Sequence, residues 1–159
     1  AEIATKAEAN FAIISRREGA FEWIPLFDDP MMAWLPQGHP LAGADAYPLS
    51  RLNEDPFIQI YPGERTDNTH ILRKHHLHLT PRFTMSDENA AYALVRAGLG
   101  VALINGLYAP PGKEIDVLPL IPAELVPIGV AMQQAESASP ASRAFRDYAL
   151  PRFAEALTK

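Results

Sequence analysis

The sequence has no cysteine among its 159 residues, so neither a disulfide framework nor a thiolate zinc site is possible. No apolar run approaches the ~20 residues of a membrane-spanning helix, and no signal peptide opens the chain. These absences lead us to expect a cytoplasmic protein that makes no contact with a membrane.

Basic residues are also few. The sequence has 14 Lys and Arg residues against 19 Asp and Glu residues, and its formal net charge is −5. Nucleic-acid-binding surfaces concentrate positive charge, so we do not expect this chain itself to contact DNA. Its length fits one domain, and a content of 48% hydrophobic and 21% charged residues is ordinary for a globular domain.

Proline is abundant, with 15 residues, and it favours many interrupted segments over a helical bundle. Short apolar runs alternate with amphipathic segments, which predicts an α/β fold with a mostly parallel sheet. We expect strands at residues 11–14, 21–27, 31–35, 56–61, 77–85, 100–104, 117–120 and 126–132. We expect helices at residues 1–9, 69–75, 87–97 and 142–157, the last of them interrupted or kinked at Pro151.

Three of these elements carry more specific expectations. The apolar run at residues 11–14 is typical of a strand that is buried on both faces. Pro25 and Pro30 cannot donate ladder hydrogen bonds, so residues 21–35 are expected to form a bent or edge strand pair rather than one central strand. Asp67 or Asn68 is the expected cap of the helix at residues 69–75.

The clearest helix lies at residues 87–97. Ser86 is a suitable N-cap, and Asp87 and Glu88 suit the positive end of the helix dipole, where we expect them on the solvent side. Gly98 stands where a left-handed residue ends a helix. The apolar run that follows at residues 100–104 completes a strand, helix and strand in order, as in a βαβ crossover.

Ligands of parallel α/β sheets bind beyond the carboxyl ends of the strands. The turn after Ile60 and the start of the helix at Ser86 are two such places. A helix N-terminus favours a carboxylate or phosphate, and Gly63 lets a backbone approach a ligand closely. The alternative is that Ser86 is only a cap and Pro62-Gly63 only a turn. The candidate ligand-binding residues are Ile60, Tyr61, Pro62, Gly63, Glu64, Ser86, Asp87 and Asn105.

Neither a metal site nor a catalytic site is predicted. His76 and His78 would share one face of a strand and His75 the other, with no acidic residue at ligand spacing, so surface histidines are the favoured interpretation. There is no G-x-S-x-G motif and no paired carboxylate with an acid–base partner. Gly98-x-Gly100 follows a helix and lacks the third glycine of a dinucleotide-binding motif. We expect no enzyme activity, no catalytic residue and no cofactor.

Four segments, taken in order, resemble the effector-binding (substrate-binding) domain of LysR-type transcriptional regulators. Each one alone is a weak signal, but their order and separations make the resemblance specific, and it covers essentially the whole chain. Residues 25–30 resemble the family's crossing strand, and residues 35–42 (LPQGHPLA) resemble its P-x-x-H-P-L-A segment. Residues 49–60 and 95–103 resemble its L-x-x-L-x-x-x-P-F-I and V-x-x-G-x-G-v-a-l segments.

The resemblance implies a fold like that of type II periplasmic binding proteins, in which two Rossmann-like subdomains are joined by two crossing strands around a ligand cleft. Residues 27–127 would form the second subdomain, and residues 1–26 with 128–159 an incomplete first one. Only the end of a family helix is expected at residues 1–9, with the earlier strands and the DNA-binding domain absent. Asn10 and Asn105 depart from the family's usual acidic residue and proline.

The function implied by the resemblance is the sensing of a small-molecule effector, for which an organic acid is expected. Effector binding would change the conformation of a homo-oligomer and so control transcription. The resemblance implies a homodimer, and a tetramer for the full-length parent. DNA would be contacted only through a separate N-terminal domain. The alternative from another class is a solute-binding protein of a transporter, which would need an upstream signal peptide or lipid anchor instead of a helix-turn-helix.

Overall fold

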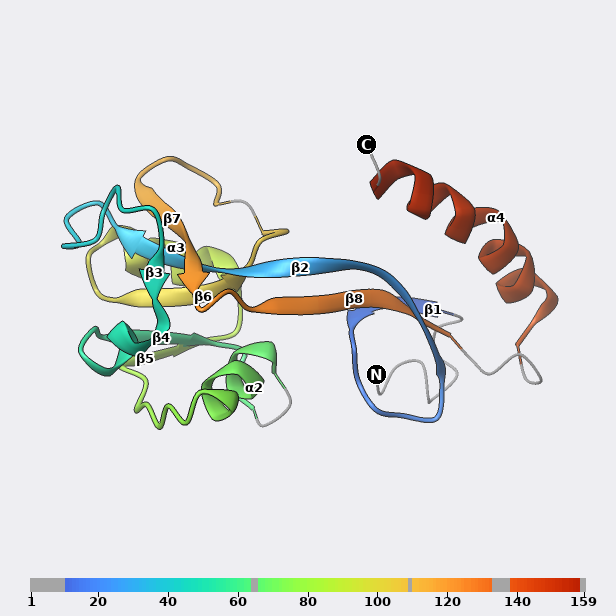
Figure 1. The fold of residues 1–159 in the computed structure, drawn as a ribbon, viewed down its shortest axis with the longest axis horizontal. Helices are drawn as coiled ribbons and strands as arrows, with labels where there is room; N and C mark the ends of the chain where they lie inside the picture. The colour runs from blue at the N-terminus through green and yellow to red at the C-terminus, as the bar shows by residue number, and fades with distance from the viewer. Residues whose placement is uncertain (1–10, 64–65, 109, 133–137, 158–159) are drawn as a thin grey trace. The chain divides into compact units, whose positions relative to one another are not determined.

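The computed structural model describes residues 11–63, 66–108, 110–132 and 138–157. The helix expected at residues 1–9 and the candidate residue Glu64 lie outside these described residues. The strands, drawn in Figure 1, are β1 (Phe11–Ser15), β2 (Glu22–Pro36), β3 (Tyr47–Pro48), β4 (Phe57–Ile60), β5 (Phe83–Met85), β6 (Val101–Asn105), β7 (Ile115–Ile121) and β8 (Leu125–Met132). The helices are η1 (Leu49–Asn53), α2 (Asp67–Lys74), α3 (Glu88–Arg96) and α4 (Pro140–Leu157).

The chain divides into two compact units. Unit 1 comprises Ala1–Asp29 with Val126–Lys159, and unit 2 comprises Pro30–Leu125. β2 passes from unit 1 into unit 2, and the chain returns at the start of β8. The subdomain boundaries expected from the sequence, 1–26 with 128–159 and 27–127, stay a proposal.

The sheet of unit 2 is mixed. β4 lies between β5 and β6 and is parallel to both, whereas β2 is antiparallel to β6 and β7, and β3 is parallel to β7. Three of these five pairings are parallel and two are antiparallel, and the pairing of β1 with β8 is antiparallel as well, so the prediction of a mostly parallel sheet is only partly correct. An apolar run in the sequence marks a buried strand but carries no information about its direction, and β2 enters this sheet against the direction of β6.

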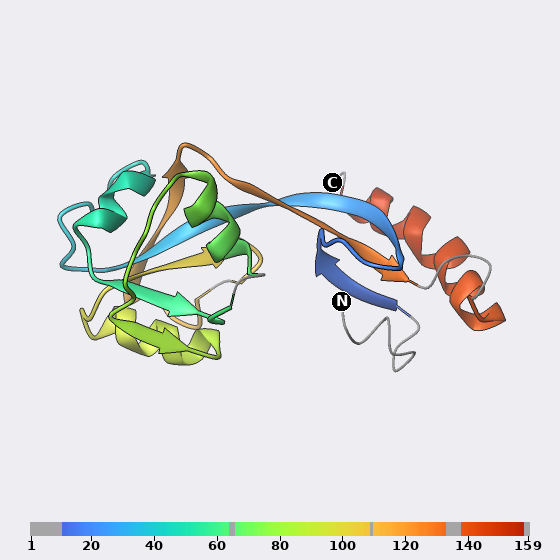
Figure 2. The ribbon, with the colours of Figure 1, turned by 90° about the horizontal axis from the view of Figure 1, so that it is seen from below.

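Two helices cover opposite faces of this sheet, as Figure 2 shows. α3 packs its buried residues against Trp34, Ile58, Ile60, Ala102 and Ile104. α2 lies on the other face, where the side-chain amide of Asn68 donates to the backbone oxygen of Leu103 at 3.1 Å. Because side chains alternate along a strand, β6 presents neighbouring residues to the two helices in turn.

In unit 1, β1 pairs antiparallel with β8 in a register that sets Phe11 opposite Met132. Phe11 is 38% and Ile13 54% exposed, so the prediction of a strand buried on both faces is wrong. These two side chains share one face of the strand. Phe11 stacks on Phe145 of α4 with ring centroids 3.8 Å apart. α4 is a single helix that contains Pro151, so it is not interrupted there, and the kink that was the other expectation stays a prediction.

The expectation of two strands within residues 21–35 is also wrong, because β2 runs unbroken over 15 residues. Pro25 and Pro30 are both exposed. A proline loses its donor but keeps its acceptor, and the Pro30 oxygen accepts from the Gly106 N–H at 2.7 Å. The strand continues through this residue by using the acceptor alone.

The strand expected at residues 77–85 is reduced to the three residues of β5. His76 and His78 precede it in irregular backbone, with His76 at a φ of 55°. The assignment of these histidines to strand faces is therefore wrong. An irregular strand was expected around Pro81, which cannot donate a ladder hydrogen bond, and pairing with β4 is observed only from Phe83 to Met85.

Candidate functional site

The carboxyl ends of three parallel strands meet at one edge of unit 2. β4 ends at Ile60, β5 at Met85 and β6 at Asn105. The register aligns Ile60 with Met85, and the Tyr61 N–H donates to the Met85 oxygen at 2.8 Å. We call this the strand-end edge and define it by the residues Tyr61–Gly63, Ser86–Glu88 and Asn105–Tyr108. It brings together the candidates that the sequence singled out after separate strands.

The residues after β4 present side chains to solvent. Ile60 is 3% exposed and packs into the core, so it anchors the strand end. Tyr61 follows it with a φ of 51° and an exposed fraction of 47%. Pro62 and Gly63 are exposed, and the Gly63 oxygen accepts from the Thr69 hydroxyl at 2.7 Å. The turn is thereby tied to the first turn of α2.

The caps of both helices differ from the sequence prediction by one or two residues. Asp87, not Ser86, caps α3, because its Oδ1 accepts from the Ala90 N–H at 2.9 Å. Thr66, not Asp67 or Asn68, caps α2 through the Thr69 N–H at 3.2 Å. Threonine and aspartate both provide the acceptor oxygen that an N-cap needs. One of the backbone N–H groups at the start of α3 that lack a partner within the helix is therefore already hydrogen-bonded to a carboxylate.

Hydrogen bonding to the Glu88 carboxylate across the edge raises the pKa of Tyr61 from 10.0 to about 12, with smaller contributions from partial burial, the charge of Glu88, Tyr108 and Asp87. Asp87 is exposed and Glu88 half-buried in the first turn of α3, which agrees with their expected place near the positive end of the helix dipole. Glu88 and Tyr108 also act on Tyr61 at this edge, and sequence reasoning did not include them among the candidates. The strand-end rule that selected Asn105 could have been extended to Tyr108, three residues further on.

Replacing Glu88 with glutamine should return the pKa of Tyr61 from about 12 toward 10, because the neutral amide no longer favours the protonated phenol. The ring-carbon chemical shift of Tyr61, followed by NMR through an alkaline titration, measures this change. Asp87→Asn is the matched control, since the Asp87 carboxylate makes a smaller contribution, and it should shift the titration less. An unchanged Tyr61 titration in Glu88→Gln would contradict the hydrogen bond.

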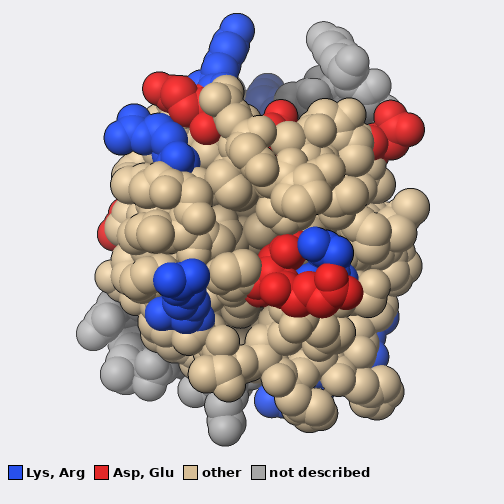
Figure 3. All heavy atoms as spheres, turned by 90° about the vertical axis from the view of Figure 1, so that its left-hand side faces the viewer, with Lys and Arg blue, Asp and Glu red and all other residues tan. Residues whose placement is uncertain are grey.

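Several cations of unit 2 lie toward the opposite edge of the sheet. Arg82 immediately precedes β5, Arg96 is the last residue of α3, and Arg51 belongs to η1 ahead of β4. Figure 3 shows one face of unit 2, where the described acidic and basic side chains gather in a few small groups, some of which contain both, on a mostly uncharged surface. At the strand-end edge, the charges of Asp87 and Glu88 are both negative.

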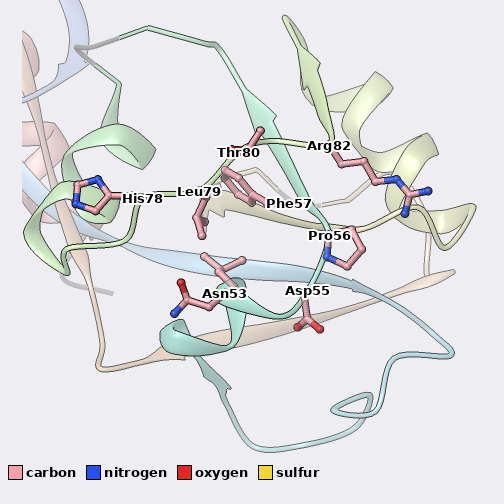
Figure 4. Close-up of a pocket in the computed structure, with 9 residues that line it drawn as sticks. Asn53, Asp55, Pro56, Phe57, His78, Leu79, Thr80 and Arg82 are labelled. Atoms are coloured by element: carbon pink, nitrogen blue, oxygen red, sulfur yellow. The ribbon is translucent and has the colours of Figure 1, made fainter.

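A surface pocket of about 250 Å³ lies at that opposite edge, lined by residues that include Asp55, Phe57, Leu79 and Arg82. Asp55 accepts hydrogen bonds from the Tyr47 hydroxyl at 2.8 Å and from His39 Nε2 at 3.0 Å, so its charge is already satisfied. Figure 4 shows the Arg82 guanidinium extending away from Leu79 and Phe57. The pocket therefore does not direct charged groups toward one point, which ligand sites usually do.

His39, from the P-x-x-H-P-L-A segment, has a structural role. Its Nδ1 accepts from the Leu41 N–H at 3.1 Å, which leaves Nε2 as the donor to Asp55. His75 Nε2 lies 2.6 Å from Glu124 Oε1. Within the described part of the chain, no group of three or more His, Cys, Asp or Glu residues is arranged to hold a metal ion.

Comparison with known proteins identifies the family. The LysR substrate binding domain matches residues 5–154, nearly the entire chain. The chain belongs to this family. It is 24% identical over 141 residues to the HTH-type transcriptional regulator YybE of Bacillus subtilis, covering 87% of this chain and 48% of YybE. It is 28% identical over 139 residues to the regulator YnfL of Escherichia coli, covering 82% of this chain and 46% of YnfL.

Solved structures of LysR-family regulatory domains share the fold. The regulatory domain of CcmR from Synechocystis, in complex with 2-PG, superposes with a TM-score of 0.81 at 20% identity, covering 96% of this chain and 77% of that one. The effector-binding domain of QuiR, in complex with shikimate, gives a TM-score of 0.80 at 22% identity, covering 97% of this chain and 76% of the QuiR chain. The α/β, periplasmic-binding-protein-like fold class predicted from the sequence is confirmed.

This LysR-family chain spans about half the length of the curated relatives it matches. Those relatives are transcriptional regulators, which agrees with the regulatory class predicted from the sequence. Among the residues that the structure describes, no helix has the length and apolar character needed to cross a membrane.

Proposed function

We propose that this LysR-family domain senses a small-molecule effector at the strand-end edge and transmits its binding to the oligomeric regulator of which the domain is part. One observation carries the proposal: three parallel strands end together there and present Tyr61, Asp87 and Asn105 side by side from separate loops. This is where parallel α/β sheets bind ligands. Family membership and the ligand-bound CcmR and QuiR domains support the same role.

The proposed effector is a small organic acid that carries hydroxyl groups. Asp87 and Glu88 repel an acidic group, whereas their oxygens accept from hydroxyls, so this edge would contact the hydroxylated side of the ligand. The acidic group would be bound by other parts of the protein. The proposed contact residues are Tyr61, Pro62, Gly63, Ser86, Asp87, Glu88, Asn105 and Tyr108. Shikimate, the ligand of the QuiR domain, belongs to this chemical class.

The proposed regulator is cytoplasmic and forms homodimers, with a tetramer in the full-length parent, and it contacts DNA through a separate helix-turn-helix domain. The effector would shift an existing conformational equilibrium of this oligomer. No catalytic step is assigned to the domain. The names of the relatives YybE and YnfL favour this regulatory role over a solute-binding protein of a transporter.

Isothermal titration calorimetry of the intact protein tests the proposal with matched acids, shikimate against cyclohexanecarboxylate and 4-hydroxybenzoate against benzoate. We expect a hydroxylated acid to bind more tightly than its partner. Replacing Tyr61 with phenylalanine should weaken that binding about tenfold, the effect of one hydrogen bond to a charged network. Asn53→Ala, at the opposite-edge pocket, should leave the affinity unchanged. Loss of binding in Asn53→Ala but not in Tyr61→Phe would place the site elsewhere.

A further inference from the structure

Helix α2 begins at the strand-end edge. Thr66 caps it, and the Thr69 hydroxyl donates to the Gly63 oxygen at 2.7 Å while lying 2.8 Å from the Thr66 hydroxyl. Gly63 belongs to the turn that follows β4. The position of this turn is therefore connected by hydrogen bonds to the first turn of α2, and a ligand that moves Gly63 must act on the helix as well.

The other end of α2 is fixed to a buried carboxylate. The Lys74 ammonium lies 2.9 and 2.8 Å from the two carboxylate oxygens of Glu124, and His75 Nε2 lies 2.6 Å from its Oε1. The Glu124 side chain is only 6% exposed. Burial alone would raise the pKa of Glu124, but the bonds from Lys74 and His75 outweigh it and hold that pKa below its ordinary value. Glu124 therefore stays charged at neutral pH, and its two partners are the charged and titratable groups that act on it.

Glu124 also holds the strand that connects the two units. Its backbone oxygen accepts from the Met31 N–H at 2.8 Å. Met31 lies one residue beyond the point where β2 enters unit 2, and Glu124 lies just before the point where the chain leaves it at Leu125–Val126. One residue thus joins α2 to both passages of the chain between the units.

The middle of α2 is fixed as well. The buried Asn68 amide donates to the Leu103 oxygen in β6, so the helix is held against the sheet between its two ends. A short helix with fixed attachments moves as a body, because bending it would break the hydrogen bonds along its axis. A displacement at one end is then passed to the other.

We propose that α2 couples the effector site to the connecting strands, with Glu124 as the positioning residue that receives the movement of α2 and transmits it to Met31. This coupling rests on the proposed effector site, whose signal it would carry. Coupling between two sites is reciprocal, so a change at either end of α2 must alter the other. The coupling can therefore be measured without an effector.

Amide hydrogen exchange in the intact protein, followed residue by residue by NMR, provides the test. Thr66→Ala removes the cap of α2, and the Met31 amide should exchange about fivefold faster, the effect of losing one N-cap. Glu124→Gln keeps the shape of the side chain but removes its charge, and the Thr69 amide should exchange faster in return. Lys74→Arg keeps the charge on Glu124 and should leave both rates near those of the unmodified protein.

Asp87→Ala is the matched control. It removes the cap of α3, which makes no contact with Glu124 in any described interaction, at a similar cost in global stability. Met31 exchange should therefore rise in Thr66→Ala but not in Asp87→Ala. Equal changes in the two variants, or an unchanged Thr69 amide in Glu124→Gln, would overturn the coupling. That failure is distinct from failure of the proposed function, which is decided by effector calorimetry.

Discussion

Replacing Trp34 with alanine is expected to lower the free energy of unfolding by about 3–5 kcal/mol, the usual cost of removing a large aromatic side chain from a core. Trp34 is 1% exposed and packs edge-on against Tyr92, with ring centroids 6.1 Å apart and an interplanar angle of 86°. It also contacts the cluster that joins α3 to the sheet. Urea denaturation followed by circular dichroism measures the change.

Val117→Ala provides the matched control for this experiment. Val117 lies directly opposite Trp34 in the β2–β7 pairing, but its side chain is 36% exposed. Its replacement should cost less than about 1 kcal/mol, the span of strand preferences in a host protein. Similar losses in both variants would show that the strand pairing, and not the core on the α3 side, determines the effect.

Gly100→Ala is expected to lower the free energy of unfolding by about 1–3 kcal/mol through overpacking. A Cβ at this position would lie 2.4 Å from the backbone oxygen of Pro56. That oxygen accepts from the Val101 N–H at 2.8 Å where β6 begins beside β4, so it cannot move away without breaking the pairing. The same denaturation experiment measures the loss.

Gly38→Ala is the control for the glycine substitution. Nothing lies within 4 Å of a Cβ built on Gly38, and its φ is not in the left-handed region. Alanine there should be neutral or should stabilise the protein by about 0.4–1 kcal/mol, because it restricts the unfolded chain. A loss in Gly38→Ala as large as that in Gly100→Ala would contradict the steric explanation.

Local patterns predicted local structure well. The helix at residues 87–97 is observed as α3, and Gly98 ends it with a φ of 75°, as its position in the sequence indicated. The cap was misplaced by one residue because Ser86 and Asp87 are both strong N-cap residues. The N-cap is the last residue with extended backbone before the first helical residue, here Glu88. The residue types alone do not determine which of the two positions that is.

Strand direction and continuity could not be predicted. Pro30 indicated a break in β2, yet the strand passes through it because tertiary pairing uses only its acceptor. The exposure of Ile13 is likewise set by what packs on its face of β1, not by the apolar character of its own segment. These properties depend on partners that are distant in the chain.

The positions of the candidate residues at one edge of the sheet were predicted in outline. The strand-end rule brought Tyr61, Asp87 and Asn105 to one edge, as the structure places them. It did not reveal that Glu88 reaches Tyr61, because that contact joins two loops whose separation in the sequence gives no indication of distance. The hydroxyl preference proposed for the ligand follows from this contact.

The left-handed backbone of Tyr61 sets the stability of the fold against the proposed role of its side chain in ligand binding. A non-glycine residue with a φ of 51° stores strain of about 1–2 kcal/mol that glycine would not. Tyr61→Gly would relieve this strain, but it would also remove the phenol that we propose contacts the effector. The residue that would recognise the ligand is thus also one at which the folded backbone is held at a cost.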